Sequence, residues 1–259
     1  MSISLAVLWT KISQSNACFI LDMQITLIFQ LPLKATLPSQ EKHLGDLWRV
    51  AKLFEPLGFP IEKWYPSAST PKISLANPAF DQSGPTPIAL AMLRAKDEKD
   101  KTIDYRITAV WNGATKGRCA AFSSSLSSDV DLPRCVFNLQ FERVAELDDS
   151  KTMQQFVHGL VDIWPTASQI RVGPLRYYTA HKVFAKRPGA GWMLYLATAI
   201  TAVELPEAAE LVPVTEGDKQ KGTIIISVAD ELFTVDNPEH VKIANAIEVR
   251  LADQDLLPR

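Results

Sequence analysis

The chain has 259 residues, a formal net charge of −2 and an apolar fraction of 47%, which is ordinary for a globular protein. That length allows one large domain or two small ones. A net negative charge argues against a dedicated nucleic-acid binder, which carries a clustered basic patch. Three cysteines without CxxC spacing argue against a disulfide framework or a zinc site and are typical of a reducing cytosol. We therefore expect a cytoplasmic protein with no metal or other cofactor.

Residues 1–22 do not read as a secretory signal, because their only cation, Lys11, follows the apolar run and no clean cleavage site appears. No apolar run in the chain approaches the roughly 20 residues of a membrane helix. A clear strand pattern opens at Met23. We expect residues 1–22 to be an upstream extension outside the fold, residues 23–259 to form a single domain, and the protein to have no membrane partner.

The first half of the chain alternates strand and helix patterns. Ser39 is a good N-cap for a helix that reaches Phe54, and Pro56 and Gly58 end it. The Ser- and Pro-rich stretch 66–86 reads as a long loop, and 96–101 and 123–131 read as shorter polar loops. The pattern predicts strands over 23–31, 103–111, 118–123 and 134–146, and helices over 39–54 and 86–94.

The second half closes with a helix that Asp236 or Asn237 caps and whose Ile247 is buried. Its charged residues, Glu248 among them, are expected to face water. The pattern predicts helices over 151–164 and from 238, one or two helical turns over 206–211, and strands over 168–172, 192–196 and, centrally, 223–228. We therefore predict an α+β fold, a mostly antiparallel sheet with helices packed on it, in which 40–145 and 150–255 form two similar αβ halves.

The sequence carries none of the common catalytic motifs. The sequence has no HExxH, GxSxG, P-loop or GxGxxG pattern. His43 and His158 lie on predicted helices without a carboxylate in motif register, which indicates structural roles. We expect no enzyme activity.

The stretch from Gly173 to Leu196 gathers side-chain types that are enriched at protein interfaces. Gly and Pro at 188–191 are turn signals, so we interpret the stretch as a loop between core elements that carries recognition side chains. The same aromatic residues would equally fill a core beside a turn. The residues expected to contact a partner here are Tyr177, Tyr178, His181, Arg187 and Trp192.

Two further groups are candidates for the same partner-binding face. Trp111 and Asn112 precede Gly113 in a strong turn signal, and this turn is a possible neighbour of the stretch above. The acidic residues Glu146, Asp148 and Asp149 can face a basic partner, or form a plain solvated face.

Three segments together resemble the immunity protein 52 family of bacterial polymorphic toxin systems. They are VWNG at 110–113, GPLRYYTAHKVFAKRPGAGWMLYL at 173–196 and GTIIISVADELFTVDNPEHVKIANAIEVRLADQDLLP at 222–258. The resemblance runs from about residue 23 to the C-terminus.

The resemblance implies an α+β cytosolic protein that binds and silences a cognate toxin with a restriction-endonuclease-like nuclease domain, of the kind delivered by type VI secretion. It supplies no catalytic residues. We expect a protein partner, no nucleic acid, and a monomer or homodimer. The alternative is a small-ligand-binding protein or enzyme with a pocket formed by Tyr178, His181 and Arg187.

Overall fold

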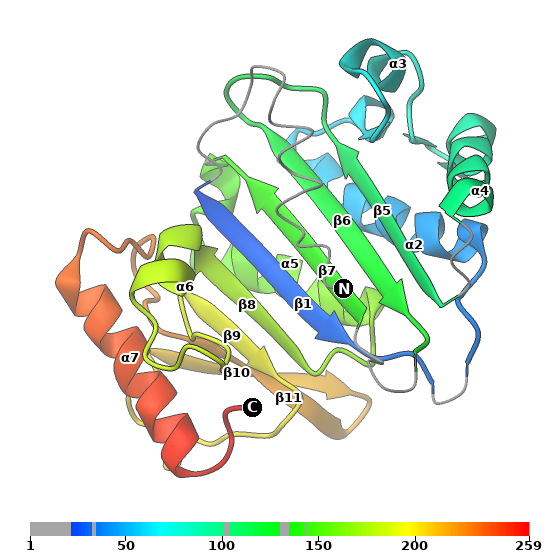
Figure 1. The fold of residues 1–259 in the computed structure, drawn as a ribbon. Helices are drawn as coiled ribbons and strands as arrows, with labels where there is room; N and C mark the ends of the chain where they lie inside the picture. Colours follow the sequence, from blue (N-terminus) through cyan, green and yellow to red (C-terminus); the bar gives the residue numbers. More distant parts are fainter. Residues whose placement is uncertain (1–21, 33–34, 101–103, 130–134, 143, 259) are drawn as a thin grey trace.

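The computed structural model describes residues 22–32, 35–100, 104–129, 135–142 and 144–258. Its centre is one nine-stranded sheet with the strand order β10-β11-β9-β8-β1-β7-β6-β5-β2 (Figure 1). The paired strands in this sheet are antiparallel, which confirms the expected fold class. The strands are β1 (Met23–Phe29), β2 (Tyr65–Pro66), β5 (Tyr105–Trp111), β6 (Ala120–Ser127), β7 (Cys135–Phe141), β8 (Gln169–Pro174), β9 (Met193–Leu196), β10 (Glu210–Glu216) and β11 (Lys219–Ile226).

Strand β1 divides the sheet into two sides. The strands of residues 40–145 lie on one side of it and those of residues 150–255 on the other. The two halves of the chain therefore share one sheet, as expected, although their orders of helices and strands differ. Strand β11 is an interior strand, but it lies one position from the edge of the sheet.

Two long helices cover one face of the sheet and confirm the predicted helices there. They are α2 (Gln40–Phe54) and α5 (Ser150–Ile163), which pack on each other. The side chain of Ser39 caps α2, as expected. Phe29 of β1 points to this face, because its ring lies 5.5 Å from that of Trp164 at the end of α5. Apolar residues of both helices and of the sheet belong to one hydrophobic core.

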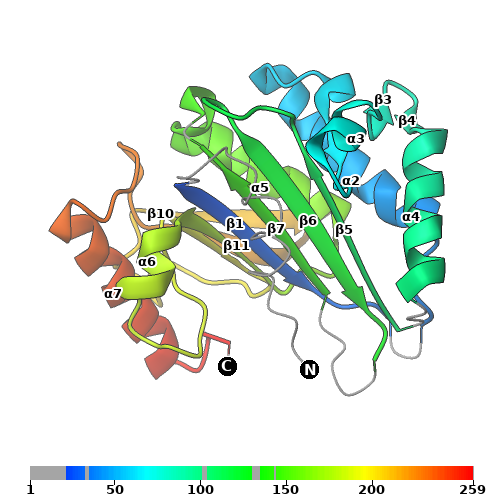
Figure 2. The same ribbon diagram turned by 45° about the horizontal axis from the view of Figure 1, so that its top comes forward.

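Helices α6 (Leu175–Ala180) and α7 (Pro238–Asp253) cover the other face over strands β8 to β11 (Figures 1 and 2). Arg171 of β8 points to them, with its guanidinium 4.7 Å from the ring centroid of Tyr178. Next to them, β1, β6 and β7 turn polar side chains to this same face. By strand register these are Gln24, Thr26, Ser123, Ser125, Asn138 and Gln140.

The stretch expected to be a long loop over 66–86 holds short elements instead. Helix α3 (Pro71–Leu75) forms because Thr70 accepts a hydrogen bond from the amide of Ile73 and Pro71 occupies the first turn. A small hairpin of β3 (Phe80–Asp81) and β4 (Gly84–Pro85) follows. Figure 2 shows these elements beside the β5 edge of the sheet.

Other predicted boundaries were wrong where tertiary contacts decide them. Helix α4 (Pro87–Asp100) passes its expected end and runs through the expected loop at 96–100, where Asp97 pairs with Arg106 of β5 at 2.7 Å. Strand β6 extends to Ser127 through an expected loop, because it pairs with β5 as far as Ser127 and with β7 as far as Ser125. Residues 206–211 form no helix, and β10 begins there at Glu210. Within the described residues, no helix is both long and apolar enough to cross a membrane.

Candidate functional site

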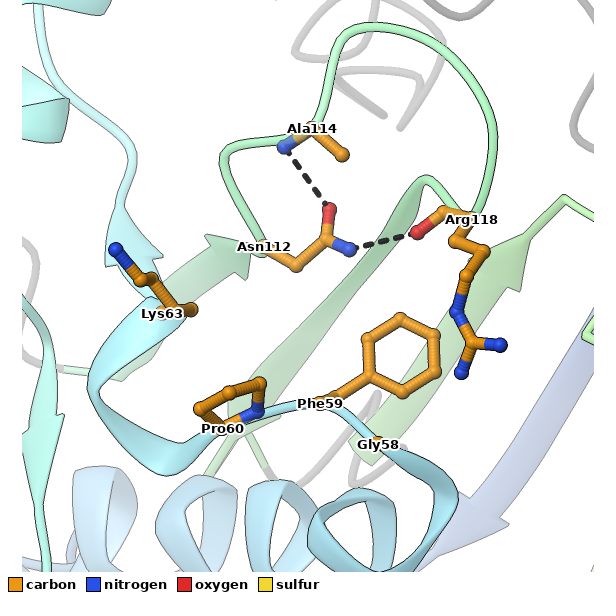
Figure 3. A pocket seen from close by; sticks show the side chains of 7 residues that line it. All are labelled: Gly58, Phe59, Pro60, Lys63, Asn112, Ala114 and Arg118. Atoms are coloured by element: carbon orange, nitrogen blue, oxygen red, sulfur yellow. Dashed lines mark hydrogen bonds between the residues drawn. The ribbon is translucent and has the colours of Figure 1, made fainter.

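A pocket of about 250 Å³ opens beside the loop that joins β5 to β6. The short 3-10 helices η1 (Glu55–Leu57) and η2 (Ile61–Lys63), with the turn between them, form its opposite wall. Figure 3 shows the Phe59 ring and Pro60 as its apolar floor, with Lys63 and Arg118 at opposite sides. The lining residues are Gly58, Phe59, Pro60, Lys63, Asn112, Ala114 and Arg118.

Asn112 holds the β5–β6 loop in one conformation. Its side-chain oxygen accepts hydrogen bonds from the amides of Ala114 (3.3 Å) and Ala120 (3.1 Å). Its side-chain nitrogen donates to the carbonyl of Arg118 at 2.7 Å. The sequence marked Asn112 as a partner contact, but its side-chain amide is used within the loop. Its role there is to position the pocket wall.

Gly113 in the same loop has φ +72°, a conformation that favours glycine. A side chain there would also meet the Tyr65 ring, since an added Cβ would lie 2.7 Å from it. The predicted Asn-Gly turn is therefore fixed both by backbone conformation and by packing.

Arg118 is held by three contacts at one side of the pocket. Its backbone is left-handed, with φ 54°, which is uncommon for a residue other than glycine. Its guanidinium donates to the carbonyl of Leu57 and lies 4.8 Å from the ring centroid of Phe59. One further nitrogen reaches the Glu146 carboxylate of η3 (Ala145–Leu147) at 3.3 Å. Sequence reasoning missed Arg118, because these contacts join segments up to 61 residues apart.

The charges around the pocket are unequal. The pKa of Glu146 is lowered, first by its own backbone amide and then by Arg118. Lys63 is exposed, and its ammonium projects outward at the rim (Figure 3) without a hydrogen bond or ion pair to another described residue. Lys116 in the β5–β6 loop is also exposed. The pocket therefore has a positive rim in which Glu146 partly offsets Arg118.

A half-exposed apolar surface adjoins the pocket. The ring of Trp111 lies 6.5 Å from that of Tyr65, and its indole nitrogen donates to Ser74 at 2.8 Å. On α3, Ile73 is 46% exposed and Leu75 is 43% exposed. Trp111 thus remains a candidate contact residue, with neighbours that the sequence did not single out.

The expected recognition loop at 173–196 is instead a short helix and a turn whose aromatic residues are buried. Tyr177, Tyr178 and Trp192 are 0%, 6% and 0% exposed. Helix α6 turns both tyrosines inward, and the Trp192 nitrogen donates to the carbonyl of Val228 at 2.8 Å. Burial raises the pKa of both tyrosines. The expectation that these three side chains form an exposed aromatic surface was wrong.

His181 and Arg187 are half-buried. The Arg187 guanidinium lies 5.4 Å from the ring centroid of Phe184 and donates to the Leu257 carbonyl at 3.4 Å. These residues lie near β8, whereas Trp111 and Asn112 lie at β5. Strands β1, β7 and β6 stand between the two groups, which is roughly 19 Å at the usual strand spacing. The two groups are therefore not neighbours.

Glu248 on α7 is fully buried, so the expectation that it faces water was wrong. Its carboxylate accepts hydrogen bonds from the Tyr177 hydroxyl, from the amide of Val183 at 2.9 Å and from the amide of Ala190 at 3.0 Å. These contacts tie the segment after α6 to α7 and explain the buried charge. The site is structural.

The acidic group lies near the pocket, at η3 and the start of α5. Glu146 and Asp149 are exposed, and Asp148 is half-buried. Asp149 caps α5 by accepting from the amide of Thr152 at 2.8 Å, which lowers its pKa. Ser150, the next residue, is the first residue of the helix.

The fold and this site define an α+β protein built on one large antiparallel sheet, with a small preformed pocket at one end. No set of three or more His, Cys, Asp or Glu side chains in the described residues could hold a metal ion. The chain belongs to the immunity protein 52 family, whose model matches residues 46–259. The match begins within α2, so β1 lies outside it. Membership gives the protein an immunity-type role, with a cognate toxin protein as its binding partner.

Among solved structures, the chain is similar to the Pseudomonas aeruginosa T6SS protein PA0821. The two are 12% identical, with a TM-score of 0.49, over 87% of this chain and 72% of that chain. No curated protein matches the chain.

Proposed function

We propose that this protein binds and neutralises a restriction-endonuclease-like nuclease toxin of a type VI secretion system, and so protects the producing bacterium from within its cytoplasm. The observation that carries the proposal is the family match, which spans every element from within α2 to α7. Inhibition by binding requires a stable surface, and no catalytic group of its own.

The β5–β6 end of the sheet supports this proposal as a binding surface. Asn112 fixes its loop from within, and Arg118 is held by Leu57, Phe59 and Glu146. A surface that is already ordered loses little conformational freedom when a partner binds. The half-exposed Trp111 belongs to a residue type that is enriched at interface hot spots.

The alternative of a ligand or catalytic pocket at Tyr178, His181 and Arg187 gains no support from the geometry. The Tyr178 hydroxyl is buried, and Arg187 is engaged by Phe184 and Leu257. We expect a variant that combines His181→Ala with Arg187→Ala to keep its fold and its toxin protection. A reproducible activity of the parent protein that this pair abolishes would favour the alternative.

Co-expression with a candidate toxin domain, to be sought among the genes beside this one, tests the proposed function. The protein should restore growth, co-purify with the domain and suppress its cleavage of DNA in vitro. Light scattering of the complex would give its stoichiometry and show whether the free protein is a monomer or a homodimer. Binding to a toxin domain that cleaves no nucleic acid would keep the immunity role and reject the nuclease target.

A further inference from the structure

The pocket at the β5–β6 loop combines an apolar interior with a positively charged rim. Phe59, Pro60 and Ala114 contribute carbon atoms to its wall. Lys63 lies at one side and Arg118 at the other, as Figure 3 shows. A carbon-lined hollow of about 250 Å³ has room for one apolar side chain, and its charged rim selects what lies next to that side chain.

The rim is positive although the whole chain carries a formal charge of −2. Lys63 has no ion-pair partner among the described residues, and Lys116 is exposed on the loop above. The ion pair between Arg118 and Glu146 is long, and both of its side chains are 46% exposed. A carboxylate from outside can therefore replace Glu146 at little cost, because exposed pairs are weak.

The apolar surface continues from the pocket along the outer side of the loop. Tyr65 and Leu75 both lie against Gly113, as the positions of an added Cβ show. Ile73 is exposed on the same short helix as Leu75. An apolar anchor in the pocket would thus be flanked by further contact area for the same partner segment.

We propose that this pocket receives one apolar side chain from a loop of the toxin, and that acidic residues next to that side chain pair with Lys63, Lys116 and Arg118. This inference rests on the proposed function and names the partner chemistry. Interface hot spots cluster where side chains fill well-packed pockets that are desolvated on binding. The rim charges set the orientation and rate of docking.

Two substitutions test the pocket and its rim separately. Ala114→Phe fills the hollow and keeps the backbone amide that bonds Asn112. Lys63→Glu reverses one rim charge. Lys219→Glu is the matched control, since Lys219 is exposed at the β10–β11 turn on the opposite edge of the sheet. Binding to an inactivated form of the toxin domain identified by co-expression is measured by calorimetry at low and moderate salt.

We expect Ala114→Phe to weaken binding by about 30-fold or more, the scale of a lost anchor. Lys63→Glu should weaken it by about tenfold, with an effect that shrinks as salt increases. Lys219→Glu should bind like the parent, and all variants should keep the parent melting temperature. Should Ala114→Phe not fold, Ala114→Leu takes its place.

The inference is overturned if both folded pocket variants bind the toxin domain as tightly as the parent protein does. In that case the parent protein still binds the toxin, and the proposed function stands. Tighter binding by the Lys63→Glu variant would show that the partner loop is not acidic. Absence of binding by the parent protein rejects the proposed function instead, so the two failures are distinguishable.

Discussion

The Tyr177 hydroxyl on α6 donates a hydrogen bond to the buried carboxylate of Glu248 on α7, and it also lies 3.0 Å from the side-chain oxygen of Asn245. The burial and the neighbouring carboxylate raise the pKa of Tyr177, so its hydroxyl keeps its proton as a donor. This contact joins residues 71 positions apart. It makes the aromatic stretch part of the core and changes what its mutation should do.

We expect Tyr177→Phe to lower stability by about 1–3 kcal/mol, because it leaves a buried carboxylate with one donor fewer. Glu248→Gln should also destabilise, since it removes the charge from these hydrogen bonds. Thermal unfolding measures both, with Thr179→Ala on the exposed side of α6 as the control. A stable Tyr177→Phe variant that has lost toxin affinity would contradict the structural role and restore the interface reading.

Ile247 is fully buried in α7, so Ile247→Ala should cost about 2–4 kcal/mol through lost burial and the cavity left behind. Val249 on the same helix is 42% exposed, and Val249→Ala is the control with a smaller expected loss. Urea unfolding of both variants gives the difference. Equal stability of the two would show that α7 does not pack as described.

Burial, and next the positive charges of Arg106 and Lys96, lower the pKa of His43 from 6.5 to about 3. Between these two pH values the unfolded chain binds a proton at this residue and the folded chain does not. Stability should therefore fall on acidification from about pH 6.5 towards pH 3, by up to about 1.4 kcal/mol per pH unit from this group. His43→Gln should reduce that slope in urea unfolding measured across the window, and an unchanged slope would refute the assignment.

The strand pattern of the sequence begins at Met23, and residues 1–21 fall outside the part of the chain that the structure describes. We expect residues 1–22 to be dispensable. A chain that begins at Met23 loses the hydrogen bond from the Leu175 amide to the Asp22 carbonyl, worth about 1 kcal/mol. It should keep its melting temperature within a few degrees and still protect against the toxin. A chain that begins at Asp22 controls for that bond. A large loss in both would show that residues 1–21 belong to the fold.

Local patterns in the sequence predicted the long helices and most strands. The apolar period and caps of α2 and α7 depend on neighbours in sequence, and so they were readable. The serines of β6 were not, because serine has little strand preference and their pairing is decided by the neighbouring strands β5 and β7. Helix α3 was missed because it is a single short turn in a Ser- and Pro-rich stretch.

The site was less predictable than the fold, for a physical reason. Glu248 sits among charged residues in sequence, and only its contacts with Tyr177 and Ala190 show that it is buried. The pocket likewise depends on Arg118 reaching Leu57 across 61 positions. The Asn112-Gly113 turn was the one local signal that marked its wall. The tertiary fold decides which residues from distant segments come together. Such contacts leave no periodic pattern in the sequence.

The acidic residues Glu146, Asp148 and Asp149 lie together beside the pocket. If the toxin presents a basic surface to them, neutralising Glu146, Asp148 and Asp149 should mainly slow association, because exposed charges steer partners before contact. Asp149→Asn keeps a side chain that can cap α5, so a triple variant with Glu146→Gln and Asp148→Asn should stay folded. Stopped-flow binding to the inactivated toxin domain should show a reduced association rate whose deficit shrinks as salt is raised, since the Debye length is about 8 Å at physiological ionic strength. The dissociation rate should change little. Faster association by the triple variant would show that the acidic group repels the toxin, and a loss confined to dissociation would make it a direct contact rather than a steering patch.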